Sequence, residues 1–428
     1  MKAYLTGSMP LRMFGFSLFY LAQGIPIGLV AIALPAWLAA QGVQAAQIAT
    51  IAAITGLPWG LKLISGPFMD RFSFAPMGRR RPWVMAAQAG LTVAMFSLTA
   101  IDDPAQHIWQ IIVMCTVINT FAAVQDVAVD GMAIDVLPED ERGRANAFMA
   151  FGQVVGFSAF GALNGYLLVA HGLAVTAIVS GSALALVFAF ATAARERHNE
   201  RVLPWTAGEA TEREQPPSAS FFGIFKDLLR ALLLPMSLVL VGVEVLARAS
   251  AGIAISISPT LAVQELGFSS EQYAYWIGIM GGASAFVGIL FGPLIDRFGA
   301  VRLLQVGLVF GGVTAAGFAS VQWMWGELWV VLGALILSNL SSQLVFVATI
   351  AMFMGVCWEK VAATQFAVYM SLSNLSRSVG AGAFAFIAAD VSYAQAIYLI
   401  AVLLVGAAVL LALFDPVQHQ KAIRGLAA

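Results

Sequence analysis

Apolar runs long enough to cross a membrane, separated by short polar stretches, make up most of the 428-residue chain. A helix of about 20 apolar residues crosses the roughly 30 Å hydrocarbon core of a bilayer. Such a helix also satisfies its own backbone hydrogen bonds where water is absent. The pattern predicts twelve spanning helices, near residues 13–38, 47–69, 82–101, 108–134, 145–169, 172–193, 232–261, 272–295, 301–321, 327–356, 362–388 and 394–414.

The composition agrees with a helical membrane protein of many spans. Hydrophobic residues make up 60% of the chain and charged residues only 11%, which no ordinary soluble domain matches. The net charge of −1 gives no basic surplus that would indicate nucleic-acid binding. Cys115 and Cys357 form neither a metal motif nor a disulfide framework, so we interpret both as packing residues. The first span exceeds the apolar length of a signal peptide, and we expect it to be retained.

A long polar stretch at 194–220 divides the predicted spans into two groups of six. Its arginines and a Pro-Pro pair at 216–217 favour a flexible linker. Apolar and charged side chains then alternate over 221–230, as in a short amphipathic helix on a membrane surface. We therefore expect a six-helix bundle at 1–193, a linker with a surface helix at 194–231, a second bundle at 232–415 and a tail at 416–428.

The basic side chains indicate how the chain crosses the membrane. Apart from three inside the spans, every lysine and arginine falls at a terminus, in the linker or in loops on one side. The loops on the other side, such as 39–46 and 264–272, contain none. Because basic loops stay in the cytosol, we predict that both termini and the linker are cytosolic.

A short sequence pattern occurs at equivalent positions in the two groups of spans. Residues 66–72 read GPFMDRF and residues 292–298 read GPLIDRF, and each copy ends the second predicted helix of its group. Two similarly oriented halves, related by an axis along the membrane normal, are typical of transporters in which the halves rock against each other. The repeat therefore predicts an all-α membrane protein built from two pseudo-symmetric six-helix bundles.

Three acidic and three basic side chains lie within the predicted spans: Lys62, Asp126, Asp130, Glu244, Arg248 and Arg377. A charge at the centre of a membrane helix costs about 2.5–3.5 kcal/mol. Asp126 and Asp130 share one helix face, and their mutual repulsion favours protonation of one of them. We predict that Asp126 or Asp130 carries a proton, with Lys62 and Glu244 in the same coupling group. The alternative is a static ion pair between Lys62 and these carboxylates.

The two arginines within the second half are candidates for binding an anionic solute, since arginine binds a carboxylate through two parallel hydrogen bonds. Glu244 lies one helical turn before Arg248, so a purely structural role for Arg248 is the alternative. Arg377 has no acidic neighbour in the sequence. Amides expected along the same path are Gln23, Gln125, Gln153, Asn339 and Gln343, although hydrogen bonds between helices explain them equally well.

Charged residues at the cytosolic helix ends are candidates for a gate. Surface ion pairs are individually worth about 0–1 kcal/mol, which suits contacts that must open and close. The alternative is that the arginines only fix the orientation of the chain. The candidate gating residues are Asp70, Arg71, Arg80, Asp135, Arg142, Asp296 and Arg297.

The repeated pattern resembles the loop motif G-x-x-x-D-R-x-G-R-R of the major facilitator superfamily, with residues 78–81 (GRRR) displaced by a short insertion. Lys62, the stretch 125–143 and residues 363–367 (ATQFA) are similar to the AmpG muropeptide permease branch. The acetyl-CoA transporter family and some siderophore permeases share the Q-D-x-x-x-D signature at 125–130. The resemblance implies a twelve-helix fold in a bacterial inner membrane and import of a solute together with protons.

Permeases of the AmpG branch carry basic residues in the seventh and eleventh helices, where this chain has Arg248 and Arg377. Other charges of that branch are missing here. Ala133, Val154 and Ala251 stand where those permeases have a lysine, an arginine and an acid. The resemblance therefore supports the transport mechanism more strongly than it supports a large sugar-peptide substrate.

Other classes of function fit the sequence less well. The four histidines lie in loops or tails and no H-E-x-x-H motif occurs, which argues against an embedded enzyme. A sensor or scaffold would need a soluble output domain. We predict a secondary transporter, without cofactor or nucleic-acid partner, that binds protons and a small solute as a monomer among membrane lipids. The expected cargo is an anionic cell-wall fragment or, alternatively, a siderophore or an acyl-CoA-like compound.

Overall fold

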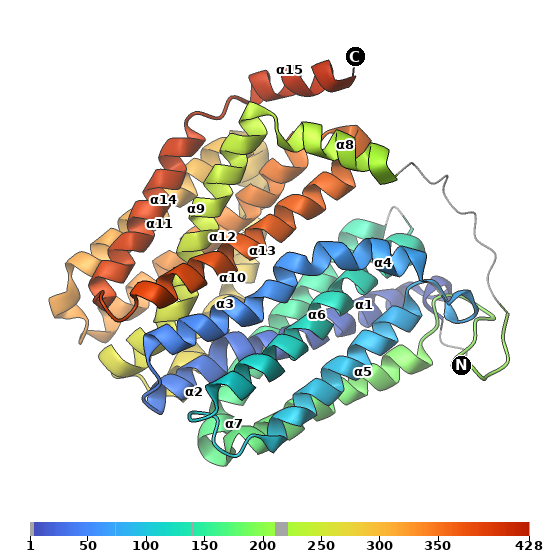
Figure 1. Cartoon of the computed structure of the whole chain (residues 1–428), viewed down its shortest axis with the longest axis horizontal. Coiled ribbons are helices and arrows are strands. Elements are labelled where there is room, and N and C mark those ends of the chain that lie inside the picture. The colour runs from blue at the N-terminus through green and yellow to red at the C-terminus, as the bar shows by residue number, and fades with distance from the viewer. Residues whose placement is uncertain (1–3, 73, 139–140, 210–220, 428) are drawn as a thin grey trace.

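A computed structural model describes residues 4–72, 74–138, 141–209 and 221–427 of the chain. The described chain is helical almost throughout, and its helices form two bundles that lie against each other (Figure 1). In the N-terminal bundle, α1 (Met9–Ile27) continues through the π-helical segment η2 (Gly28–Ala33) into α2 (Leu34–Ala40). Helix α3 (Ala45–Leu61) likewise continues through the 3₁₀ turn η3 (Lys62–Ile64) into α4 (Ser65–Arg71). The remaining helices of this bundle are α5 (Arg81–Ser97), α6 (Ile108–Val136) and α7 (Arg142–Ala193).

The C-terminal bundle follows the amphipathic helix α8 (Phe221–Leu232), which occupies the stretch predicted to form a surface helix. Its helices are α9 (Pro235–Thr260), continued by the π-helical η7 (Leu261–Glu265), α10 (Ser270–Phe298), α11 (Ala300–Ser320), α12 (Leu328–Val356), α13 (Ala362–Ile387) and α14 (Tyr393–Leu411). A last helix, α15 (Pro416–Ala427), lies beyond the bundle.

All twelve predicted spans are helical. Helix α7 contains two of them, because Gly172 (φ 76°, ψ −178°) reverses the chain within it. Only glycine adopts this backbone conformation readily. Within the described part of the chain, eight helical segments are long and apolar enough to cross a membrane by length and composition. Because one of these segments is α7 with its two spans, the eight segments account for nine of the predicted spans. The other three spans are α3–α4, α10 and α13.

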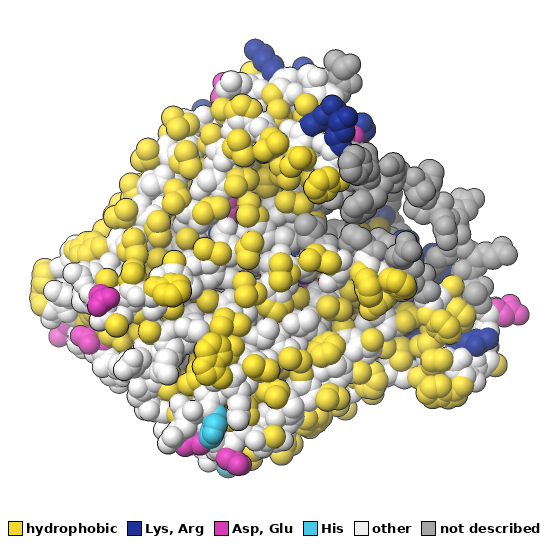
Figure 2. Space-filling view, in the orientation of Figure 1, with side chains coloured by type: hydrophobic (Ala, Val, Ile, Leu, Met, Phe, Trp, Pro, Cys, Tyr) yellow, Lys and Arg dark blue, Asp and Glu magenta, His cyan; other side chains and the backbone are white. Residues whose placement is uncertain are grey.

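The surface has the pattern of a membrane protein. Figure 2 shows hydrophobic side chains spread over the sides of both bundles, with lysine and arginine near α8 and α15 and acidic side chains along the lower left edge. We call the end of the bundles that carries the basic loops the basic end, and the other the opposite end. The distribution agrees with an apolar belt between two polar edges.

The bundles touch over the half of their length that lies toward the opposite end. Helix α3 meets α13, where Gly60 packs against Leu375, and α7 meets α10, where Gly278 packs against Ser158. The two bundles spread apart toward α4 and α8 (Figure 1). The two hydrogen bonds that join the bundles among the described residues run from the side-chain amide of Gln264 to backbone carbonyls at the opposite end. The interface is thus closed at the opposite end.

The first part of the linker is packed rather than flexible, which corrects the sequence-based interpretation of that segment. The buried Glu196 carboxylate accepts hydrogen bonds from the backbone N–H groups of Arg80 and Arg81, both at 2.7 Å. The buried Arg81 guanidinium donates to the carbonyls of Arg201 (2.7 Å) and Val202 (2.8 Å). Buried charges with satisfied hydrogen bonds hold a segment in place, so the linker adheres to the N-terminal bundle through these residues.

Candidate functional site

Lys62 and Asp126 form an ion pair between the second and fourth spans, with 2.6 Å between Nζ and Oδ2. Lys62 lies in η3, where the helix tightens to a 3₁₀ turn between α3 and α4. The two side chains are 20% and 7% exposed, and Nζ also lies 5.8 Å from the Trp59 ring centroid. The pairing expected from the sequence is therefore present, with Asp126 as the partner.

Asp130 has different surroundings although it lies only one turn further along α6. Its carboxylate accepts a short hydrogen bond from the Tyr20 hydroxyl of α1. The side chain is exposed, and no described lysine or arginine lies within ion-pair distance of it. The two aspartates thus divide into one that is buried and neutralised and one that is accessible and faces a neutral partner.

Tyr20 was not among the residues singled out from the sequence. Its hydroxyl lies in an otherwise apolar segment of α1, and a phenol within the membrane needs a hydrogen-bond partner. That requirement is the signal by which Tyr20 could have been found from the sequence. The identity of the partner was not predictable, because it depends on how α1 and α6 pack.

Amide side chains fix α6 against its neighbours. Gln125 is fully buried and donates to the carbonyl of Phe19 at 3.1 Å. Asn119 donates to the carbonyl of Thr55 at 2.7 Å. Gln153 donates to Gln23 across α7 and α1 at 3.2 Å. In this structure Gln23 and Gln125 are enclosed between helices, so the reading as helix contacts describes them better than contact with a solute.

Glu244 connects two helices of the C-terminal bundle. One oxygen of its buried carboxylate accepts hydrogen bonds from Arg248 Nε (2.6 Å) on α9 and from the Ser373 hydroxyl (2.5 Å) on α13. Arg248 is 21% exposed, and its guanidinium lies 5.7 Å from the Phe346 ring centroid of α12. Among the described residues only Nε of Arg248 is engaged, so its terminal nitrogens remain available to a ligand.

Arg377 is a half-buried cation on α13. Its guanidinium donates to the Asn374 side chain at 3.3 Å, and no carboxylate of the described chain lies within ion-pair distance. Its backbone carbonyl packs against Gly252 of α9, one helical turn after Arg248. Among the described residues Glu244 pairs with Arg248 and not with Arg377, so the two arginines carry an excess of positive charge that an anion would offset.

The two candidate amides of α12 occupy different positions. Asn339 is half-buried and donates to the carbonyl of Leu335 in its own helix at 2.9 Å. Gln343 lies directly against Gly288 of α10, and its side-chain amide would have to move if a larger residue stood there. Neither amide contacts Arg248 or Arg377 among the described hydrogen bonds.

The candidate gating residues are only partly brought together. Asp135, at the end of α6, lies 3.7 Å from Arg79 and 3.8 Å from Arg80. Arg142 and Arg297 are exposed, and Arg297 lies over the Phe298 ring at 5.3 Å. The side chains of Asp70, Arg71 and Asp296 lie outside the described residues. Each ion pair described at the basic end joins two residues of the same half of the chain, and none of them connects the two halves.

A buried ion pair at the basic end was not found from the sequence. Arg12 binds Glu141 with both ends of its guanidinium fork, Nη2–Oε1 at 2.6 Å and Nε–Oε2 at 2.8 Å. It also donates to the carbonyl of Leu5 at 2.9 Å. These hydrogen bonds hold the pKa of Glu141 below its ordinary value. The pair links the start of α1 to the start of α7.

Comparison with known proteins places this arrangement in a family. A family model described as Major Facilitator Superfamily matches residues 13–381 and 240–428. The "Anhydromuropeptide permease" of Escherichia coli (strain K12) is 26% identical over 368 residues, which cover 83% of this chain and 70% of the permease.

Solved structures agree on the fold. A D-xylose-proton symporter superposes with a TM-score of 0.71 at 13% identity, over 95% of this chain and 98% of the symporter. A bacterial homologue of the human lysosomal transporter Spinster, in an inward-facing and unoccupied conformation, gives a TM-score of 0.64 at 14% identity, over 98% of each chain. At these identities the likeness concerns the fold alone.

Proposed function

This chain belongs to the Major Facilitator Superfamily, and from that premise we propose that it imports an anionic solute together with protons across a bacterial inner membrane. The chain is a multi-pass membrane transporter and not an enzyme. In the proposed mechanism, the bundle at 1–193 rocks against the bundle at 232–415 as a monomer, while the linker at 194–231 and the tail at 416–428 remain on the cytosolic side.

The distribution of charged residues between the spans of the two bundles is the observation that carries this proposal. The N-terminal bundle has two aspartates and one lysine within its spans, whereas the C-terminal bundle has two arginines and one glutamate. The unneutralised charges are Asp130 on one side and Arg377 on the other. A proton suits the first and an anionic solute suits the second.

Asp130 is the preferred proton carrier of the two aspartates. Asp126 is already neutralised by Lys62, whereas Asp130 is exposed and bonded to a hydroxyl. An ionised carboxylate resists transfer out of water unless it is paired. Protonation of Asp130 would remove that obstacle to closure of the bundles around it, which would connect proton binding to the conformational cycle.

The closed contacts of this conformation support the direction of access. The bundles meet at the opposite end through Gln264 and spread apart at the basic end. If the basic end faces the cytosol, as the distribution of lysine and arginine favours, this conformation faces inward. An importer releases its solute and proton from such a conformation.

The substrate class rests on the arginines and on the relatives. A muropeptide-like cell-wall fragment is the first candidate, because one relative carries the name anhydromuropeptide permease. A siderophore or an acyl-CoA-type solute is the alternative, since Ala133, Val154 and Ala251 are uncharged here.

The test is uptake of labelled anhydromuropeptide into proteoliposomes under an imposed pH gradient, with siderophores and CoA esters as competitors. We expect uptake to depend on the gradient, and Arg377→Ala to raise KM at least tenfold, as the loss of a charge-assisted hydrogen bond would. Arg302→Gln, which removes an exposed arginine outside the cleft, is the matched control. Uptake that persists unchanged without a gradient would reject proton coupling, and an unchanged KM would reject the anion site.

A further inference from the structure

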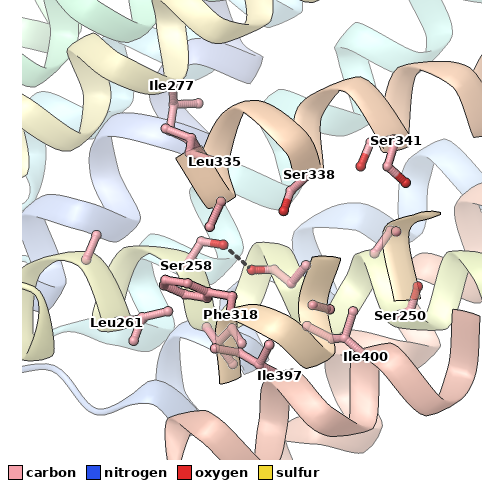
Figure 3. A pocket seen from close by; sticks show the side chains of 18 of the residues that line it. Ser250, Ser258, Leu261, Ile277, Phe318, Leu335, Ser338, Ser341, Ile397 and Ile400 are labelled. Atoms are coloured by element: carbon pink, nitrogen blue, oxygen red, sulfur yellow. Dashed lines mark hydrogen bonds between the residues drawn. The ribbon is translucent and has the colours of Figure 1, made fainter. Parts of the chain in front are cut away.

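A cavity of about 260 Å³ lies within the C-terminal bundle and is lined by residues of α9, α10, α11, α12 and α14. Figure 3 shows side chains of Ser258, Phe318, Leu335 and Ile397 converging on it from different helices. It coincides with a division of the core: one apolar cluster contains Leu240 and Leu304, and another contains Ile257 and Trp325. Most of the buried apolar residues of the N-terminal bundle form one large cluster instead.

The wall of the cavity is apolar over most of its surface, and three of its six hydroxyl groups donate hydrogen bonds to backbone carbonyls. Ser250 and Ser258 donate to carbonyls of their own helix, at 2.7 Å and 2.6 Å. Ser341 donates to the carbonyl of Gly307 at 2.9 Å. A sugar carries several hydroxyl groups, and this mostly apolar wall offers few partners for them, which is unfavourable. A hydrocarbon chain has no such requirement.

One edge of the cavity is charged. Arg248 lines it together with Ala247 and Ala251, and the backbone of Arg377 on the neighbouring α13 packs against Gly252, the next residue of α9. Arg248 has free terminal nitrogens, and Arg377 has no acidic partner among the described residues. A ligand with an apolar part in the cavity would therefore place its other end beside two cations.

We propose that this cavity binds the acyl chain of an anionic solute whose charged head group is held by Arg248 and Arg377. The proposal rests on the anion site of the proposed function and specifies the apolar part of the substrate. Ligand sites usually occupy about 300–1,000 Å³, so a cavity of 260 Å³ holds a portion of a solute rather than all of it. A medium-length acyl chain fits both the size and the chemistry of the wall.

The experiment is thermal unfolding of the full chain in lipid nanodiscs, titrated with butyrate, hexanoate, octanoate and octanol. Because a ligand of the native state raises its stability by mass action, each titration gives an affinity. We expect the affinity of the carboxylates to rise about fourfold per added methylene until the cavity is full. Octanol, which lacks the charge, should bind at least tenfold more weakly than octanoate.

Two variants on α11 distinguish binding in the cavity from partitioning of the ligand into the bilayer. Ala315→Phe places a ring in the cavity, whereas Val313→Phe places one on the exposed face of the same helix. Ala315→Phe should abolish the dependence on chain length and leave the affinity for butyrate unchanged, and Val313→Phe should behave like the parent protein. Ala254→Leu on α9 is a second filling variant if Ala315→Phe does not fold.

Three outcomes would overturn the inference: no dependence on chain length in the parent protein, the same dependence in both filling variants, or octanol binding as tightly as octanoate. These results are independent of the uptake assay. Loss of gradient-driven uptake would reject the proposed coupling without affecting chain-length dependence, and loss of chain-length dependence would leave the coupling intact.

Discussion

Tyr20 and Asp130 face each other across the contact between α1 and α6, and the tyrosine hydroxyl donates to the carboxylate. The carboxylate is exposed, whereas Asp126, one turn earlier, is buried beside Lys62. Helical spacing alone makes the two aspartates equivalent. Their partners on other helices make them different, and the predictions for coupling follow from that difference.

Asp130→Asn should make uptake insensitive to the pH gradient, because the amide of asparagine does not take up a proton as a carboxylate does. Exchange of labelled for unlabelled solute, which needs no net proton movement, should continue. Both rates can be measured in proteoliposomes with and without an ionophore. Asp126→Asn is the matched comparison, and a variant at Asp130 that retains full response to the gradient would contradict the assignment.

Lys62→Met should destabilise the protein by about 3 kcal/mol. This is the lower limit for breaking a buried ion pair, and it applies here because the Lys62 side chain is 20% exposed. The loss arises because Asp126 would keep a buried charge without a partner. The double variant Lys62→Met/Asp126→Asn should recover most of the stability. Chemical unfolding in detergent tests this, and equal stability of the single and double variants would show that the ion pair has no structural role.

Glu244→Gln should strengthen the binding of an anionic ligand several-fold. The Glu244 carboxylate, 2.6 Å from Arg248 Nε, would no longer neutralise that arginine. The same change should lower thermal stability, since the hydrogen bonds from Arg248 and Ser373 would end on a neutral amide oxygen and be weaker. Calorimetric titration and a melting curve separate the two effects. Ser373→Ala is the control, because it removes the hydroxyl contact but leaves both charges in place.

The Arg12–Glu141 pair should contribute stability that depends on pH. Arg12 holds the pKa of Glu141 below its ordinary value of 4.5, so the contribution is fully present above that value and is lost as the pH falls through the lower folded-state pKa. Melting temperatures of the parent and of Glu141→Gln should therefore differ at pH 7 and converge at strongly acidic pH. A difference that stays constant over this range would contradict the prediction.

Gln264→Ala should favour opening at the opposite end. It removes two hydrogen bonds to the other bundle, at 2.9 Å and 3.1 Å, each worth about 0.5–1.5 kcal/mol. A cysteine at Ser378, which faces Gly56 across the interface, should then react faster with an impermeant reagent added from that side. Replacing Cys115 and Cys357 by alanine removes the background, and Gln106→Ala, an exposed residue of the loop between α5 and α6 at the same end, is the control.

The positions of the spans follow from the sequence because a bilayer imposes a fixed length on each helix. The Lys62–Asp126 pair was predictable for the same reason, since the distance of each residue from its helix end fixes its depth. The hydrogen bond from Tyr20 to Asp130 and the fork between Arg12 and Glu141 depend on how helices distant in sequence pack. No local pattern carries that information.

The cavity was also outside the reach of sequence patterns. Apolar residues such as Ile257, Phe318 and Ile397 read as ordinary packing residues. Whether their side chains meet or leave a space depends on the separation of α9 and α12, which is a property of the assembled bundle. The linker is a similar case, because its arginines and prolines are typical of flexible segments while Glu196 is held by two backbone groups.

The contact between Glu196 and the first turn of α5 decides where this protein can be divided into separately expressed parts. A break placed directly after the sixth span would strip the α5 N-terminus of the carboxylate that caps it and Arg81 of two carbonyl partners. A break beyond Glu209 would leave those contacts on the same fragment. Split reporters and inserted domains therefore belong on the far side of Glu209, where the N-terminal fragment keeps its own cap.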